Sequence, residues 1–303
     1  MSLGAHAATF DGVPQFGETR SVRSAPDSRS ARDDRPTFVL VHGAHGSASS
    51  WSALLRELAL LGHRGLAVDL PGHGLDAHFP LAYQAPQDLD ALTTEPSPLA
   101  SFTLEDNASH VIETIRRVGA FGPVVLVGTS GGGATISVVG NRVPELLAGI
   151  VYLSGWCCVE LPSVAAYLAE LGHHGVAETM VNWRSADPVA LAALKKGLMA
   201  DATDDQFRAC LNLLEPADSA QVLTADSRVR ATTWGRIPHA YIRLSQDNAI
   251  PLWMQDRMIA EADALTPDNP FAVHTVDSSH LGVCLHAAQI AAILVDGFAV
   301  SER

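Results

Sequence analysis

Lysine is nearly absent from this chain of 303 residues, in which only Lys195 and Lys196 occur among 20 basic side chains. Neither lies near a motif described below, and no Lys-Ser or Lys-Thr pair follows a glycine-rich stretch, which argues against a phosphate-binding loop. The formal net charge is −13. A surface this acidic repels nucleic acid phosphates and anionic membranes, so we expect neither nucleic acid nor membrane as a partner.

Cysteine is also scarce, and its four residues lack the C-x-x-C spacing of a metal site. Adjacent cysteines rarely bridge each other, so we expect free thiols in a reducing cytoplasm. No segment has the ~18 apolar residues that a bilayer crossing requires, and the N-terminus lacks the apolar stretch of a secretory signal. The sequence therefore predicts a cytoplasmic protein without a bound metal. The cysteines are Cys157, Cys158, Cys210 and Cys284.

The composition is typical of a globular protein, because 47% of the residues are apolar and 17% are charged. The length suffices to bury a large core. Residues 1–35 differ from the rest, since residues 18–35 are rich in serine, arginine and aspartate and poor in large apolar groups. We expect this segment to be a disordered tail, because it buries too little surface to offset its ordering entropy.

Six short, nearly continuous apolar runs predict strands buried on both faces, and such strands belong to parallel sheets covered by helices. Apolar residues recur at helical spacing from Trp51 until Gly62, and Thr103 with Asp106 has the pattern of a capping box. A last helix is expected at 283–298. The alternation predicts an α/β fold with a doubly wound, mostly parallel sheet. The predicted strands are 37–41, 65–68, 123–127, 150–153, 240–244 and 271–276.

Two regions interrupt this alternation. Residues 73–101 are rich in proline and predict a long loop, which in a compact domain usually has a function or is mobile. Residues 156–236 contain helical patterns and no strand, so we expect a helical cap inserted into an α/β core of residues 36–155 and 237–303. The predicted cap helices are 163–171, 188–199 and 204–214.

The strongest motif is G-x-S-x-G at residues 128–132, directly after an apolar strand and before a helical stretch. This order predicts a sharp strand-to-helix turn that exposes the Ser130 hydroxyl at the carboxyl edge of the sheet, in strained backbone geometry. A side chain two residues away on either side would clash, so glycine is needed at 128 and 132. Ser130 is the candidate nucleophile, and a plain glycine-rich turn is the structural alternative.

A second motif, V-H-G-A-H-G at residues 41–46, follows the first predicted strand. We expect the backbone N–H groups of Ala44 and Gly131 to form an oxyanion hole, the pair of donors that holds a developing negative oxygen. Removing one such donor costs about 2.7–4 kcal/mol of transition-state stabilisation. We expect His42 to brace this loop rather than to react.

The motifs LVHGA, DLPGHG, VGTSGGG, LSQDNAIP and DSSHL occur in this order and together resemble the α/β-hydrolase superfamily over residues 37–300. More narrowly, they resemble the branch of plant methylesterases and hydroxynitrile lyases with their bacterial relatives. This family places its catalytic acid after the next-to-last strand and its histidine after the last. The resemblance implies Asp247 as the acid. Some members place the acid after the strand that follows the elbow helix, where this chain reads Ser154-Gly155-Trp156 without a carboxylate.

Position selects the base among 13 histidines. His280 lies in the loop between the last predicted strand and the last predicted helix, whereas His274 falls in the strand and His286 in the helix. A loop position gives His280 the freedom of a general base. The resulting order, Ser130, Asp247, His280, is that of the α/β-hydrolases. The alternatives are that Asp247 only forms a turn and that His280 is an ordinary surface histidine.

This triad predicts a serine esterase that forms an acyl-enzyme and requires no metal or organic cofactor. The expected substrate is a small or medium lipophilic carboxylic ester. Hydrolysis of carbon–carbon bonds or lactones uses the same triad and stays open, as does a non-catalytic small-molecule receptor of this fold. A hydroxynitrile lyase is disfavoured, because the similar lyases carry lysine and threonine where this chain has Leu281 and Gly43.

We expect four residues to line the substrate pocket, two of them beside the candidate nucleophile and histidine. The other apolar residues of the cap, including Trp183, are explained equally well by a role in the pocket wall and by packing of the cap against the sheet. The oligomeric state is left open, with a homodimer among the alternatives. The expected pocket residues are Trp156, His45, Thr129 and Leu281.

Overall fold

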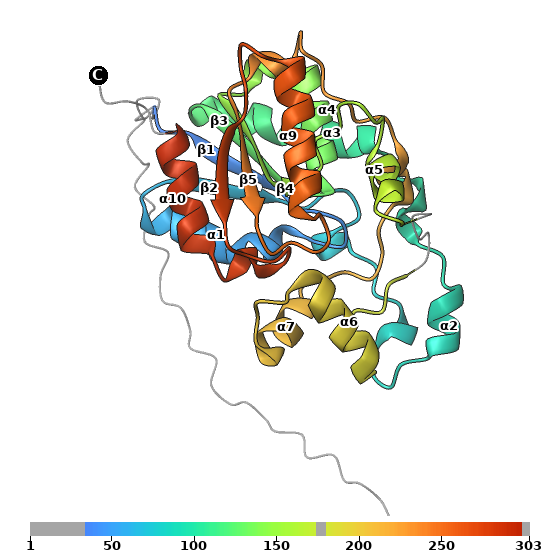
Figure 1. Ribbon diagram of the computed structural model, residues 1–303. Helices are drawn as coiled ribbons and strands as arrows, with labels where there is room; N and C mark the ends of the chain where they lie inside the picture. Colours follow the sequence, from blue (N-terminus) through green and yellow to red (C-terminus); the bar gives the residue numbers. More distant parts are fainter. Residues whose placement is uncertain (1–33, 174–179, 299–303) are drawn as a thin grey trace, which may run out of the picture. The chain divides into compact units, whose positions relative to one another are not determined.

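The computed structural model describes residues 34–173 and 180–298, so nearly all of the predicted tail lies outside the described residues. Its centre is a six-stranded sheet in the order β2-β1-β3-β4-β5-β6, in which every neighbouring pair is parallel (Figure 1). This confirms the predicted α/β class. The strands are β1 Thr37–Val41, β2 Arg64–Val68, β3 Val124–Ser130, β4 Gly149–Gly155, β5 His239–Leu244 and β6 Ala272–Val276.

Both faces of the sheet are covered by helices, as the continuous apolar runs predict. In β1, Phe38 and Leu40 belong to one hydrophobic cluster, and Val39 and Val41 belong to another, because successive side chains point to opposite faces. The first cluster includes α1 (Ser52–Leu60) and α10 (Ala287–Phe298). The second includes α3 (Leu104–Val118), α4 (Gly132–Arg142) and α9 (Leu252–Leu265). Within the described ranges, no helix is both long enough and apolar enough for a bilayer crossing.

The strand order places two loops together at one edge of the sheet. From β1, the chain adds β2 on one side and β3 to β6 on the other. In open α/β sheets the carboxyl ends of the strands form a crevice at such a reversal. The loop after β1 and the turn after β3 both lie at this point, so the topology alone brings the two strongest sequence motifs side by side.

The predicted start of the last helix is wrong. Residues Gly282–Cys284 form a short 3₁₀ turn and α10 begins only at Ala287, so His286 precedes the helix. Val283 and Cys284 line a cavity, and Val283 also packs against the cluster that contains α1 and α10. By contrast, the capping box is confirmed, because Asp106 N–H donates to Thr103 Oγ1 at 3.1 Å.

The proline-rich region is more ordered than a plain loop. It contains α2 (Leu89–Thr94) and three 3₁₀ turns, at Gly74–Asp76, Leu81–Tyr83 and Pro98–Ser101. Its buried side chains Tyr83, Leu92 and Leu99 cluster with Met180 and Ala217. The region is therefore packed against the segment that connects β4 to β5.

That connecting segment, residues 156–236, contains no strand among its described residues, as expected. The helices α5 and α8 contribute Val164 and Val222 to the sheet's own core, whereas α6 and α7 pack around Met199 and Phe207 in a separate cluster. Figure 1 shows α6 and α7 apart from the sheet and the helices that cover it. The interpretation of residues 156–236 as a helical cap stays a prediction. The helices are α5 Val164–Glu170, α6 Pro188–Leu198, α7 Asp204–Leu211 and α8 Ala220–Thr224.

Candidate active site

The turn between β3 and α4 holds Ser130 in a conformation that serine rarely adopts. Its φ angle is +50°, in the left-handed region that favours glycine. A Cβ atom at Gly132 would lie 2.4 Å from the carbonyl oxygen of His42, and one at Gly128 would lie 2.9 Å from Ile136 Cδ1. The predicted need for glycine at both positions is thus confirmed, and the turn fixes the place of the serine.

The loop of residues 42–46, which we call the oxyanion loop, lies directly against this turn. A Cβ atom on Gly43 would be 2.6 Å from Ser130 Cβ, and one on Gly131 would be 3.3 Å from the backbone nitrogen of Ala44. Among the hydrogen bonds of the described residues, none uses the N–H of Ala44 or of Gly131 as donor. Two neighbouring N–H groups beside the serine therefore have no partner within the described chain.

Asp247 and His280 meet at the ends of β5 and β6. His280 Nδ1 lies 2.6 Å from Asp247 Oδ2, and Asp247 is 4% exposed. The same Oδ2 accepts a bond from Ser154 Oγ at 2.7 Å. The N–H groups of Ala249 and Ile250 both donate to Oδ1 at 2.8 Å. The carboxylate is thus fully hydrogen-bonded and aimed at the imidazole.

Burial and charge set the protonation of this pair. Burial favours the neutral ring of His280, but the charge of Asp247 and their hydrogen bond outweigh it, so the pKa of His280 is raised. For Asp247, burial opposes ionisation, yet the charge of His280 and the bonds it accepts lower its pKa. The aspartate therefore stays ionised at neutral pH and stabilises a positive charge on the ring.

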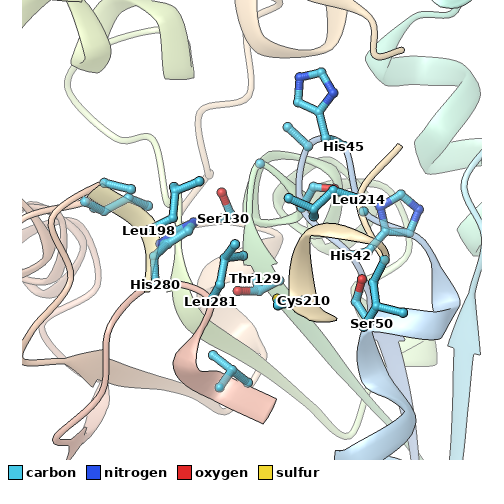
Figure 2. Close-up of a pocket in the computed structure, with 18 of the residues that line it drawn as sticks. His42, His45, Ser50, Thr129, Ser130, Leu198, Cys210, Leu214, His280 and Leu281 are labelled. Carbon is cyan, nitrogen blue, oxygen red and sulfur yellow. Dashed lines mark hydrogen bonds between the residues drawn. The ribbon is translucent and has the colours of Figure 1, made fainter. Parts of the chain in front are cut away.

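Ser130 and His280 line one cavity of about 290 Å³ (Figure 2). No hydrogen bond joins the Ser130 hydroxyl to the His280 ring among the contacts of the described residues. Such catalytic hydrogen bonds often tighten only when substrate is present. The structure thus places the candidate nucleophile and the candidate base on the wall of one cavity.

All the residues predicted for the pocket line this cavity. Trp156 is 3% exposed, and its backbone N–H donates to Ser130 O at 3.0 Å. The Thr129 hydroxyl donates a hydrogen bond to Leu153 O at 2.8 Å. His45 packs edge-on against Trp183, with ring centroids 5.1 Å apart. Leu281 is tied to the end of α6, because its N–H donates to Leu198 O at 2.8 Å.

The remainder of the lining is strongly apolar. Leucine, valine, isoleucine and tryptophan side chains dominate it, and no lysine, arginine, aspartate or glutamate is among its described residues. Its polar groups are histidines, hydroxyls and the two thiols of Cys210 and Cys284. A cavity of this kind stabilises neutral, lipophilic molecules, because a charged group would enter without a partner.

His42 braces the oxyanion loop, as predicted. Its Nδ1 lies 2.8 Å from Gly43 O, and its Nε2 accepts a bond from Leu70 N–H at 3.1 Å. Burial, helped by the neighbouring His73, lowers the pKa of His42 to about 4. The ring is therefore neutral, with the proton on Nδ1, and it is structural rather than reactive.

Sequence reasoning missed a cluster that holds the same loop from the other side, the acidic segment of residues 215–218. Asp218 Oδ2 accepts a short hydrogen bond from His45 N–H, and Glu215 N–H donates to His45 O at 2.8 Å. Glu215 also binds His73 Nδ1 at 2.7 Å and Gly74 N–H at 2.9 Å. His45 has a φ of +58°. These bonds therefore stabilise a strained residue next to Ala44.

Asp201, also missed, holds the loop that carries the histidine. It lies between α6 and α7, and its carboxylate accepts bonds from both the N–H and the hydroxyl of Ser279. His286 Nε2 lies 3.5 Å from the same carboxylate. A Cβ atom on Gly282 would be 2.5 Å from Asp201 Oδ2, so the loop fits closely around it. The residue next to His280 is thereby tied to the segment that connects β4 to β5.

These acidic residues left no local signal in the sequence. Glu215 and Asp218 lie more than 140 positions from the groups they bind in the oxyanion loop and at His73. No sequence motif distinguishes Asp201, Glu215 or Asp218 from the other acidic residues, of which the chain has 33 in all. In the part of the chain that the structure describes, no group of three or more histidine, cysteine, aspartate or glutamate side chains is arranged to hold a metal ion.

Comparisons with known proteins agree with this arrangement. The model of the alpha/beta hydrolase family matches residues 38–293. Methylesterase 1 of Arabidopsis thaliana is 24% identical over 73% of this chain and 82% of its own. Alpha-hydroxynitrile lyase of the same plant is 29% identical, over only 39% of each chain. Among solved structures, an extracellular alpha/beta-hydrolase from a Paenibacillus species superposes with a TM-score of 0.64, at 20% identity over 88% of this chain and all of that one.

The family match covers most of the chain, and the plant relatives belong to the branch that the motifs resemble. This protein is a member of the alpha/beta hydrolase family.

Proposed function

We propose that the protein is a serine hydrolase of small or medium lipophilic carboxylic esters, with Ser130, His280 and Asp247 as its triad. The observation that carries the proposal is the meeting of three elements at one cavity. These are a serine in a strained turn, a histidine whose proton affinity is set by a buried aspartate, and two unpaired N–H groups beside the serine.

In the proposed mechanism, His280 takes the proton from Ser130 as its oxygen attacks the ester carbonyl carbon. Asp247 holds the ring with its proton on Nδ1 and stabilises the positive charge that forms. The N–H groups of Ala44 and Gly131 donate to the tetrahedral oxyanion. His280 then protonates the departing alcohol, and a water activated by the same ring releases the acid from Ser130. No step requires a metal or an organic cofactor.

The apolar lining supports a neutral ester as substrate. The cavity of about 290 Å³ has no charged side chain of Lys, Arg, Asp or Glu among its described lining residues. An anionic acyl group would lose its hydration there without gaining a partner.

The described cysteines are all free thiols, which fits the proposed location in a reducing cytoplasm.

A panel of p-nitrophenyl esters tests the proposal. Acyl chains of two to eight carbons should be hydrolysed with kcat/KM rising with chain length until the cavity is filled, and a succinate half-ester should be at least about tenfold slower than the neutral ester of equal size. A lactone series in the same assay distinguishes ring opening. Tight binding of these esters without any turnover would favour the receptor and contradict the esterase.

A further inference from the structure

Two cysteines lie on the wall of the catalytic cavity, and the proposed ester chemistry uses neither of them. Cys210 comes from α7, and Cys284 comes from the 3₁₀ turn after His280. Both are half-buried and pack against the cluster formed around Met199 and Phe207. Figure 2 shows Cys210 among the residues of the cavity. A small molecule that enters the cavity therefore has access to both thiols.

The two thiols contact each other, and this contact activates one of them. The hydrogen bond between the two side chains lowers the pKa of the Cys284 thiol, although burial and the charge of Asp201 oppose the change, and it raises the pKa of the Cys210 thiol. The N–H of Leu285 also points at this sulfur. By contrast, burial raises the pKa of the Cys158 thiol to about 12. The Cys284 thiol therefore ionises more readily than the Cys158 thiol.

We propose that Cys210 and Cys284 form a dithiol modification site that reacts with hydroperoxides entering the catalytic cavity and closes to a disulfide. In the first step the Cys284 thiolate attacks one peroxide oxygen, the O–O bond breaks, and an alcohol or water leaves as the sulfur becomes a sulfenic acid. In the second step the Cys210 thiol attacks that sulfur and water leaves. Two thiols are oxidised and one hydroperoxide is reduced, so the electrons balance.

The site lies where a cross-link would affect substrate entry. The disulfide would join α7 to the turn that follows His280 and Leu281, two segments that form one wall of the cavity. It would also remove the bond that Cys284 Sγ donates to Leu281 O at 3.5 Å. Oxidation should therefore raise KM or lower kcat/KM for lipophilic esters, and reduction should restore the original value. Only this activity effect rests on the proposed function.

The test treats the full chain with hydrogen peroxide at neutral pH, blocks the remaining thiols and maps peptides without reduction. The expected result is loss of two thiols per chain and a peptide pair linked through Cys210 and Cys284, both reversed by dithiothreitol. Cys284 should react at least about tenfold faster than Cys158, because thiolate fraction controls the rate. A separate titration with phenylarsine oxide, which bridges two neighbouring thiols without oxidant, should bind one arsenic per chain.

Matched variants assign the effect to the pair. Cys284→Ser should abolish both the linked peptide and arsenic binding, and Cys210→Ser should leave Cys284 to oxidise to a sulfinic acid without a cross-link. Cys158→Ala, which removes a buried thiol outside the cavity, should change neither result. A linked peptide that is absent from the oxidised wild-type chain, or one that involves Cys157 or Cys158, would overturn the proposal. None of these readouts requires ester hydrolysis, so they stand apart from a failure of the proposed function.

Discussion

The carboxyl edge of the sheet and the segment of residues 156–236 contribute to the same site in different ways. The sheet edge supplies the groups proposed to react, namely Ser130 after β3, Asp247 after β5 and His280 after β6. The connecting segment supplies three carboxylates that touch no reacting group. Asp218 and Asp201 bind the loops on either side of the cavity, through His45 and Ser279 respectively. The third carboxylate, that of Glu215, binds His73 and the N–H of Gly74.

The residues proposed to react and the residues that hold the loops in place therefore come from different parts of the chain. The serine is placed by its own backbone, because the glycines on each side permit a turn that other residues would block. The oxyanion loop is braced locally by His42, but both it and the histidine loop are also held by acids distant in sequence. We therefore expect sheet-edge variants to abolish catalysis outright, and variants of the connecting segment to weaken it or to loosen the fold.

Ser130→Ala has the largest expected effect. Loss of the nucleophile should lower kcat for an activated ester by about 10⁴-fold or more, as for other serine triads, while the fold is retained. Initial rates with a p-nitrophenyl ester, together with a circular dichroism spectrum, measure both. Ser50→Ala is the matched control, because Ser50 lines the same cavity and should lose less than about tenfold. Equal losses in the two variants would remove Ser130 from the mechanism.

Asp247→Asn should lower kcat by about 10⁴-fold, because the imidazole loses its orientation and its charge partner. The variant should also change the pH profile. His280 must be unprotonated to act as a base, and its raised pKa places the acidic limb of kcat/KM above pH about 6.5 in the wild type. Without the carboxylate this limb should move to lower pH. A limb that does not move would mean that a group other than His280 titrates.

Glu215→Ala should cost about 3–5 kcal/mol of unfolding free energy, because it leaves the buried His73 without its partner. Burial lowers the pKa of His73, but its bond to Glu215 and nearby acids raise it more, to a net increase. The pair therefore stabilises the fold fully below pH about 6.5, and this contribution is lost as pH rises through the raised pKa. Urea unfolding at several pH values measures it. Asp226→Ala, at an exposed ion pair with Arg228, is the control and should cost under about 1 kcal/mol.

Asp218→Ala should have the smallest effect on the reaction, lowering kcat by about 10- to 100-fold with little change in KM. The variant frees the His45 N–H and so allows the neighbouring Ala44 N–H to move, and a misplaced oxyanion donor costs up to about 10²–10³-fold. Asp218→Asn keeps a side-chain acceptor for that N–H and should restore most of the rate. A loss of the same size in both variants would point to the charge of Asp218 rather than to its hydrogen bond.

Local patterns in the sequence predicted the sheet, the serine turn and the oxyanion loop, because each depends on neighbouring residues. Asp247 and His280 were predicted from the resemblance to the α/β-hydrolases, which implies an acid and a histidine after the last two strands, and the loop position selected His280. The predicted start of α10 was wrong, because the apolar residues Val283 and Cys284 belong to a 3₁₀ turn that lines the cavity. Asp201, Glu215 and Asp218 could not be predicted, since their partners lie 78 or more positions away and no pattern records such contacts.

Labelling with a fluorophosphonate, followed by peptide mapping of the adduct, tests the central claim most directly. The reagent reacts with a serine only when a base and an oxyanion hole activate it. The account predicts one phosphonate per chain, on Ser130, and none on the Ser130→Ala variant. A folded chain that takes up no label, or that carries it on another residue, would contradict the assignment of Ser130 as the nucleophile.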